Sequence, residues 1–330
     1  MNTSPVRFAF ILLPQFTMTA FAGLLDVLRL SADEGDLSRP VRCTWEVVAE
    51  TLIPVRSSSG VQVVPTDLLG DPARFDYIIV VGGQWRARQS ASPDVLDYLR
   101  RAARAQRHIV GLCTGVFALA QAGVLAGHRA CVSWFHYWDF IHQFPHFDPE
   151  AVVADRLYVF DRRRITCSGG PASIDVAARI LKRHLDPADV GKALRILQVD
   201  DADHSQPVQP LPPDVPADLP PPVGRAVLLM QQHAGQALEL SELAGRLGLS
   251  PRQLQRLFKA SMGISPQAYA RDLRLRLAAW MLERTDKSIA TIASDCGFAD
   301  AAHMGRAFRT HHGMAPGAWR SRAGAAEKAV

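Results

Sequence analysis

The sequence predicts two domains of different class: an α/β domain built on a parallel sheet, followed by an all-α domain made of two repeated helical units. Three observations predict this arrangement. Short apolar runs alternate with helical stretches up to residue 200, a proline-rich stretch occupies 201–222, and a pattern of residues repeats within 223–322. A chain of 330 residues is long enough for two separate hydrophobic cores.

Strands and helices are expected to alternate through the first 200 residues. Buried apolar strands that alternate with helices are typical of a parallel sheet covered on both faces. The expected strands cover 7–13, 45–49, 77–81, 108–112, 156–160 and 164–167. The expected helices cover 18–31, 93–106, 114–122 and 172–184.

The stretch 201–222 is interpreted as a linker. It contains many prolines and few large apolar side chains, so it cannot bury enough surface to fold, and proline stiffens it toward polyproline II. We therefore expect one domain at 1–200 and a second at 223–322. A disordered tail is expected at 323–330.

Charge is distributed unevenly between the two expected domains. Residues 223–330 carry 15 basic and 8 acidic side chains, a net charge of +7, whereas residues 1–222 carry 22 basic and 24 acidic ones, a net charge of −2. All of the basic excess therefore lies in the C-terminal third. Such asymmetry indicates a nucleic-acid-binding segment joined to an ordinary globular domain.

Several classes of protein are disfavoured by composition. No run of 18 apolar residues is present, so no membrane span is expected, and the N-terminus lacks a basic lead and a cleavage site, which favours a cytoplasmic location. Five cysteines without a CxxC pair predict neither a disulfide framework nor a zinc site. We expect no cofactor and no metal.

The second domain contains an internal repeat. Leu243-Ala244 and Gly248-Leu249 return 49 positions later as Ile292-Ala293 and Gly297-Phe298, whereas several later residues return after 50 positions. The residues with the longer offset are Arg256, Phe258, Lys259, Gly263 and Tyr269, which return as Arg306, Phe308, Arg309, Gly313 and Trp319. Two copies of one supersecondary unit explain this pattern.

Each copy has the sequence features of a helix-turn-helix unit. Ser241, Ser250 and Ser288 are placed to cap helices, while Gly248 and Gly297 supply sharp turns. Apolar residues form a buried stripe on the helix after each turn, which leaves donor-rich side chains outside, suited to base edges and phosphates. The exposed donors expected to bind DNA are Arg252, Gln253, Gln255, Arg256, Lys259, His303, Arg306 and Arg309.

A helical protein-interaction bundle is the alternative for this domain. The repeat, the basic excess and the placement of arginine and glutamine together favour binding to double-stranded DNA. Residues 223–322, with the segments GISPQAYARDLRLRLAAWML and GFADAAHMGRAFRTHHGMAPGAWR, resemble the AraC/XylS-type DNA-binding domain. The resemblance implies seven helices and two recognition helices that enter successive major-groove segments about 34 Å apart.

The resemblance also assigns base-reading positions. By position, the readers would be Arg252, Gln255 and Arg256 in the first recognition helix and His303 and Arg306 in the second. The second helix departs from the usual polar pattern, because small residues stand at positions that often carry readers: Ala301, Ala302 and Gly305. The second helix is therefore expected to make few direct contacts with base edges, and indirect readout of DNA shape is expected to contribute more to its sequence specificity.

Cys113 lies in HIVGLCTGVFALAQAG, between an expected strand and an expected helix. Such a turn would aim the sulfur at the helix N-terminus, where the dipole favours a thiolate.

Residues 6–200 resemble the DJ-1/PfpI (class I glutamine amidotransferase-like) fold, which implies a flavodoxin-like sheet. Joined to an AraC-type domain, this fold resembles the GlxA-like transcription regulators. CVSWFHYWDF and RITCSGGPASIDVAA look most like the regulators of arginine, carnitine and glycine betaine metabolism.

Hydrolases of this fold place a histidine and an acid near the cysteine. Here Thr114 follows Cys113, the acid position corresponds to the apolar stretch around Ala20, and Ser133 stands where many related chains carry histidine. Because a nucleophile without a base is poorly equipped, we expect no enzyme activity and no catalytic residue. A structural thiol and a pocket-lining thiol remain open. The rival functions are a cysteine hydrolase or glyoxalase with an appended DNA-binding domain, and a thiol redox sensor.

The strand ends are expected to form a ligand pocket, because open α/β sheets bind ligands beyond the carboxyl ends of their strands. Its aromatic rings would form a cation–π cage, unless they belong to the core or to a dimer interface. The expected lining residues are Gly83, Trp85, Cys113, Thr114, Ser133, Trp134, His136 and Gly169.

The leading hypothesis is an activator that responds to a small nitrogenous metabolite of the arginine, carnitine or betaine class. Its expected partners are promoter DNA, RNA polymerase and a second copy bound through the N-terminal domain.

Overall fold

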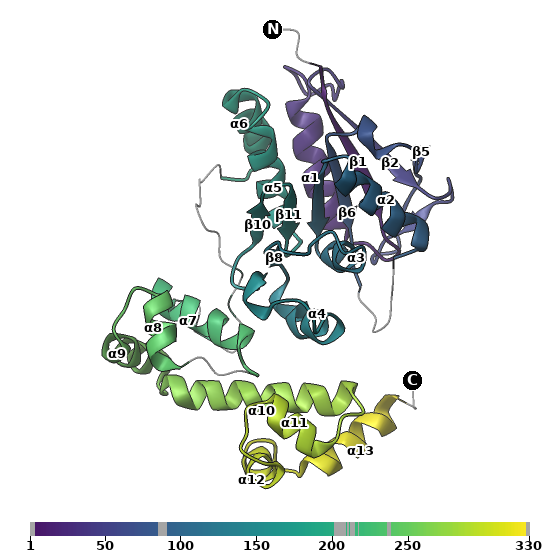
Figure 1. Cartoon of the computed structure of the whole chain (residues 1–330). Coiled ribbons are helices and arrows are strands. Elements are labelled where there is room, and N and C mark those ends of the chain that lie inside the picture. Colours follow the sequence, from purple (N-terminus) through teal and green to yellow (C-terminus); the bar gives the residue numbers. More distant parts are fainter. Residues whose placement is uncertain are drawn as a thin grey trace. The chain divides into compact units, whose positions relative to one another are not determined.

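The computed structural model describes residues 4–84, 91–200, 209, 211, 215–216, 218–235 and 239–327. It divides into two compact units, Met1–Gln209 and Pro210–Val330. The first is an α/β unit and the second is helical (Figure 1), so the expected fold classes are confirmed. In the part of the chain that is described, no helix combines the length and apolar character needed to cross a membrane.

A seven-stranded sheet forms the centre of the N-terminal unit. Its strand order is β10-β11-β7-β6-β1-β2-β5, and each neighbouring pair is parallel except β10 with β11. Its strands are β1 (Val6–Leu12), β2 (Cys43–Ala49), β5 (Asp67–Leu68), β6 (Tyr77–Val81), β7 (His108–Leu112), β10 (Tyr158–Asp161) and β11 (Arg164–Cys167). Two small sheets pair β3 (Val55–Arg56) with β4 (Gln62–Val63), and β8 (Ala130–Cys131) with β9 (Val152–Val153).

Helices cover both faces of this sheet, as the apolar strands require. One face is covered by α1 (Met18–Ser31), α5 (Ala172–Leu181) and α6 (Pro187–Ile196), and the other by α2 (Pro93–Arg104), α3 (Gly115–Gln121) and α4 (Tyr137–Gln143). Short 3-10 turns span Pro72–Arg74, Trp134–His136 and Pro149–Ala151. Along β1 the buried side chains alternate between the two faces, so Phe8 and Phe10 meet α1 while Ala9 and Ile11 face α2 and α3.

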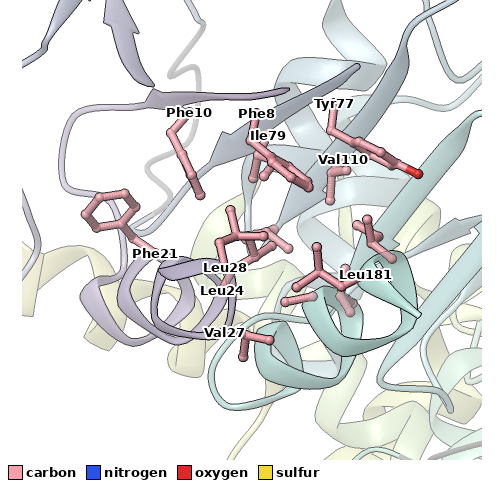
Figure 2. Packing of buried hydrophobic residues seen from close by; sticks show 14 of the residues in the cluster. Phe8, Phe10, Phe21, Leu24, Val27, Leu28, Tyr77, Ile79, Val110 and Leu181 are labelled. Carbon is pink, nitrogen blue, oxygen red and sulfur yellow. The ribbon is translucent and has the colours of Figure 1, made fainter. Parts of the chain in front are cut away.

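The core beneath α1 is rich in aromatic rings. Figure 2 shows α1 presenting Phe21, Leu24 and Leu28 to the sheet. The Phe8 ring stacks on Tyr77 with centroids 5.2 Å apart, and Phe10 meets Phe21 edge-on at 5.3 Å. This packing fixes the start of α1 close to the carboxyl ends of the central strands.

The C-terminal unit has seven helices in its described residues, as the resemblance implied. They are α7 (Pro221–Gln232), α8 (Leu240–Arg246), α9 (Pro251–Met262), α10 (Pro266–Arg284), α11 (Ile289–Asp295), α12 (Ala301–His312) and α13 (Pro316–Glu327). Helices α8 and α9 form one helix-turn-helix pair, and α11 and α12 form the other. The chain is helical at 323–327, where a disordered tail was expected.

Capping residues and turns set the helix boundaries of both pairs. Ser250 accepts a hydrogen bond from the Gln253 amide at 3.3 Å, and Ser288 accepts one from the Thr291 amide, as expected. The expected cap at Ser241 is wrong, because α8 begins one residue earlier and places Ser241 in its first turn. Gly248 and Gly297 adopt φ values of +70° and +69°, a left-handed conformation that glycine adopts without strain.

Candidate nucleic-acid interface and strand-end pocket

Helix α9 has one buried face and one polar face. Leu254 and Phe258 are fully buried and fix which side of the helix faces inward. The exposed side chains opposite them recur at helical spacing: Arg252, Gln255, Arg256 and Lys259. Within the described chain these four make no ion pair and no side-chain hydrogen bond, so all their donors are available to phosphates and base edges.

Gln253 is also exposed, but its side chain has a second role. Its Oε1 accepts hydrogen bonds from the backbone N and the Oγ of Ser250, each at 2.9 Å. Together with the bond from the Gln253 amide to Ser250 Oγ, this forms a capping box. The carbonyl end of Gln253 therefore holds the start of α9, and its amide NH₂ group is the part that remains available to DNA.

Helix α12 has the same inward face but a poorer outer face. Met304 and Phe308 are fully buried, and His303, Arg306 and Arg309 are exposed. With the offset of 50 positions, two donors of α9 are replaced by residues without one, because Ala302 stands in place of Arg252 and Gly305 in place of Gln255. The structure thus presents every expected DNA-binding side chain at the surface, and more of them on α9 than on α12.

The start of α12 carries a negative charge that α9 lacks. Asp300 caps the helix by accepting a hydrogen bond from the His303 amide at 2.6 Å. That backbone hydrogen bond lowers the pKa of Asp300, so the cap is an anion at neutral pH. The His303 ring packs edge-on against Phe298, with centroids 5.6 Å apart. A carboxylate here weakens the attraction of this helix start for phosphate.

In the N-terminal unit, Cys113 follows β7 in a strained turn. Its φ of +54° is unusual for a residue with a side chain, and its amide donates to the Cys167 carbonyl at 3.0 Å. Gly169 lies directly against it, because a Cβ at Gly169 would come within 2.8 Å of the Cys113 Cβ. The geometry is that of the expected elbow between a strand and a helix.

The Cys113 thiol has Thr17 as its side-chain partner. Thr17 Oγ1 lies 3.6 Å from the sulfur, across 96 positions of sequence, and no histidine or carboxylate of the described chain is hydrogen-bonded to the thiol. Burial raises the pKa of Cys113, and the hydrogen bonds from Thr17 and Thr114 only partly oppose this. Burial thus favours the neutral thiol over the thiolate that the helix N-terminus was expected to favour.

Sequence reasoning did not find Thr17. The acid position of the family was aligned with the stretch around Ala20, which is fully buried in the core. Thr17 instead occupies the N-cap position of α1, where the chain turns from β1 into the helix. Its place just before the first helix was the available signal.

Three other expected pocket residues form a separate cluster. Ser133 Oγ accepts from the Phe135 amide at 3.4 Å and caps the turn Trp134–His136. His136 Nδ1 lies 3.0 Å from an Asp139 carboxylate oxygen. The Trp134 ring is 40% exposed and meets Phe135 edge-on, with centroids 5.7 Å apart, so these two rings do not face one another as walls of a cage.

A pocket of about 300 Å³ opens at the carboxyl ends of β1, β2 and β6. It is lined by Ile11, Leu12, Leu13, Pro14, Ala49, Glu50, Thr51, Ile53, Val55, Gly83, Gln84, Ala91, Ser92, Val95, Thr114, Ala118 and Gln121. Of the expected lining residues, Gly83 and Thr114 belong to it, and Thr114 Oγ1 donates to the Gly83 carbonyl at 3.0 Å. Absent from its lining are Cys113, Ser133, Trp134, His136 and Gly169. Trp85 lies outside the described residues.

Glu50 gives this pocket its charge. It is the one ionisable side chain among the described lining residues, and its carboxylate has no basic partner in the described chain. The Ser92 hydroxyl, at the start of α2, donates to Glu50 Oε1 and accepts from the Val95 amide. The carboxylate is thereby held at a mostly apolar pocket, an arrangement suited to a cation.

Comparisons with known proteins agree with this architecture. The DJ-1/PfpI family model matches residues 7–183, and a helix-turn-helix domain model matches residues 243–322. The HTH-type transcriptional regulator GbdR of Pseudomonas aeruginosa is 29% identical over 320 residues, covering 96% of this chain and 84% of GbdR. ArgR, an HTH-type transcriptional regulator of the same organism, is 33% identical over 231 residues, covering 70% and 69%. The crystal structure of an AraC family transcriptional regulator from Pseudomonas putida shares the fold over 58% of this chain and all of its own, with a TM-score of 0.51 and 22% identity.

Proposed function

The chain belongs to the DJ-1/PfpI family and is a transcription regulator with an AraC-type DNA-binding domain, and from this premise we propose that it is an activator that responds to a small nitrogenous metabolite bound through its cationic group. The observation that carries the proposal is the Glu50 carboxylate at the strand-end pocket, with no basic side chain in the described lining. Arginine, carnitine and betaine are the proposed ligand class.

The chemistry of the pocket matches such a ligand. A carboxylate binds a guanidinium group through paired hydrogen bonds, or attracts a quaternary ammonium group by charge alone. Apolar side chains such as Leu13, Ile53 and Val55 supply contacts for methyl or methylene groups. A volume of about 300 Å³ is at the lower end of the range for small-molecule sites, which suits a metabolite of this size.

Cys113 has no catalytic part in this proposal. Its thiol has Thr17 and not a base as its partner, and burial raises its pKa. Both observations count against a nucleophile and against a redox-sensing thiolate. We expect Cys113→Ser to leave ligand-dependent promoter activation within about two-fold of the natural protein, measured with a reporter gene. Loss of activation, or loss of a hydrolase activity, would favour one of the rival functions.

The proposed regulator acts in the cytoplasm as a homodimer formed through the N-terminal unit, and it contacts RNA polymerase at the promoter. Analytical ultracentrifugation of the full chain tests the dimer directly, and a monomer at micromolar concentration would contradict it.

The effector class is tested by thermal unfolding of the full chain with arginine, carnitine, choline and betaine, and with succinate as an anionic control. We expect at least one of the four nitrogenous compounds to raise the melting temperature, since a ligand that binds only the folded state stabilises it. Glu50→Gln should abolish this rise by removing the charge while keeping the shape.

Glu34→Gln is the matched control, because Glu34 is an exposed glutamate outside the pocket and its loss changes the net charge equally. A nitrogenous compound that stabilises the natural chain and Glu50→Gln equally would place the effector elsewhere. Stabilisation by succinate alone would overturn the effector class.

A further inference from the structure

Gln209 is a linker residue with an unusual environment. It lies within the proline-rich stretch 201–222, yet only 3% of its surface is exposed. Glutamine is mostly exposed in proteins, and its buried polar atoms need hydrogen-bond partners. Its position is therefore decided by specific contacts with the N-terminal unit, to which it belongs.

Four hydrogen bonds hold Gln209. Its Oε1 accepts from the Trp134 amide at 2.8 Å, and its Nε2 donates to the carbonyls of Val132 at 2.8 Å and Arg156 at 2.7 Å. Its own amide donates to the Asp155 carbonyl at 3.1 Å. The side-chain amide thus uses its acceptor and both of its donors.

The groups that bind Gln209, here called the socket, are the backbone groups of Val132, Trp134, Asp155 and Arg156. The socket is part of the fold and is specific for glutamine. It is built on the parallel pair β8–β9, and the Val132 amide continues this pair by donating to the Val153 carbonyl at 2.9 Å. Val132 and Asp155 are 1% and 6% exposed. A glutamate would direct a carboxylate oxygen at two carbonyls, and an asparagine is one methylene shorter.

We infer that this socket is a docking site whose occupant is Gln209 of the interdomain linker, and that the docked residue sets the length of the tether to the DNA-binding unit. Leu211, two positions further along, belongs to the other unit and lies near Gly224 of α7. With Gln209 docked, one residue separates the two anchored positions in sequence. The inference rests on the proposed function in two respects, namely that the C-terminal unit binds promoter DNA and that two copies are joined through their N-terminal units.

Undocking would change the tether greatly. Residues 201–210 would then all separate the N-terminal unit from Leu211, and ten residues reach at most roughly 33–36 Å when fully extended. Because effective concentration falls as a tether lengthens, docking restricts how the DNA-binding unit is presented to a promoter. Any event in the N-terminal unit that alters the segment around Trp134 would thereby alter DNA binding.

Amide hydrogen exchange of the full chain tests the docking. Gln209→Ala removes the acceptor of the Trp134 amide, so exchange at Trp134 should become at least about ten-fold faster. Gln62→Ala is the matched control, because Gln62 is an exposed glutamine of β4 in the same unit, and it should leave this exchange unchanged. Equal protection of Trp134 in Gln209→Ala and the natural chain would overturn the docking.

A second pair of variants changes Trp134, the residue whose amide donates to Gln209. Trp134→Pro removes the amide that donates to Gln209 at a first-turn position that tolerates proline, whereas Trp134→Ala keeps the amide and removes the ring. Exchange at the Gln209 amide should become faster in Trp134→Pro only. Faster exchange in both variants would show that the ring, and not the amide, holds the linker.

The tether itself is tested by small-angle scattering and promoter titration of the same variants. Gln209→Ala should increase the radius of gyration and change promoter affinity by about three-fold or more, while Gln62→Ala matches the natural chain. If Trp134 loses protection but both the scattering and the affinity stay unchanged, the docking exists without controlling the tether, and the inference is wrong.

Discussion

The two recognition helices share an interior and differ at the surface. Phe258 of α9 and Phe308 of α12 are both fully buried, and each packs on an aromatic residue 11 positions later, Tyr269 or Trp319, with ring centroids 5.7 Å apart. On the outside, two donors of α9 give way to Ala302 and Gly305 in α12. The core of the repeat is thus duplicated, while its exposed donors are duplicated only in part.

This difference teaches that packing and recognition are separable within one repeated unit. Buried aromatic residues are needed in both copies because each pair of helices requires its own apolar contacts. Exposed donors are needed where bases are read and where phosphates fix the position of the unit, and these needs can differ between the two copies. We infer that α9 supplies most of the sequence reading and that α12 mainly positions the unit on the phosphate backbone, through Arg306 and Arg309 and not through its start at Asp300.

The largest expected effect tests the shared interior. Phe258→Ala and Phe308→Ala should each lower the free energy of unfolding by about 3–5 kcal/mol, because each leaves a cavity at a fully buried site. Urea unfolding followed by circular dichroism measures both losses. Losses that differ by more than about 2 kcal/mol would show that the two cores are not equivalent.

The next effect tests the unequal surfaces. Arg256→Ala should weaken specific promoter binding by about 1–3 kcal/mol, whereas Arg306→Ala should cost at most about 1 kcal/mol because its neighbours offer few donors. Gel-shift titrations at one fixed salt concentration give both values. Arg195→Ala, which removes an exposed arginine from the N-terminal unit, is the control for net charge. Equal losses of binding free energy in Arg256→Ala and Arg306→Ala would contradict the proposal that α9 reads most of the sequence.

The smallest effect concerns the two caps. The bond from the His303 amide holds the pKa of Asp300 below its ordinary value of 3.8. The stability that this cap contributes is therefore fully present above about pH 4 and is lost as the pH falls through the lowered pKa. Ser250 does not titrate, so the cap of α9 has no such dependence.

Nuclear magnetic resonance of the His303 and Gln253 amides during an acid titration distinguishes the two caps. The His303 amide should shift and lose protection below about pH 4, and the Gln253 amide should not. Asp300→Asn keeps a capping side chain that does not titrate and should remove the pH dependence. An acid-induced change that persists in Asp300→Asn would assign it to another group.

Much of the fold could be predicted because its signals are local. The apolar run of β6 and the serines that precede α9 and α11 lie within a few residues of the structures they specify. The failed prediction at Ser241 is also instructive. Ser241 is the second residue of α8, and a shift of two residues from the N-cap position at Glu239 makes it an ordinary first-turn residue.

Of the two candidate sites, the exposed face of α9 could be predicted from the sequence and the strand-end pocket could not. The exposed donor face of α9 follows from helical spacing once Leu254 and Phe258 are buried, so its exposed residues could be named in advance. The pocket could not be named in the same way. Glu50 and Ser92 come together only because β2 lies next to β1 and because the start of α2 lies beside the end of β2. Sequence periodicity does not contain the order of strands in a sheet.

The sequence by itself determined the alternation of strands and helices, the repeat, and the positions of donors on α9, since these depend on neighbours within one or two helical turns. Tertiary structure alone decided that Thr17 faces Cys113 across 96 positions and that Gln209 is buried in a socket built around Val132 and Arg156. Such contacts depend on which strands pair and where loops meet. Their free energy comes from desolvation and hydrogen bonds between distant segments, which no local pattern encodes.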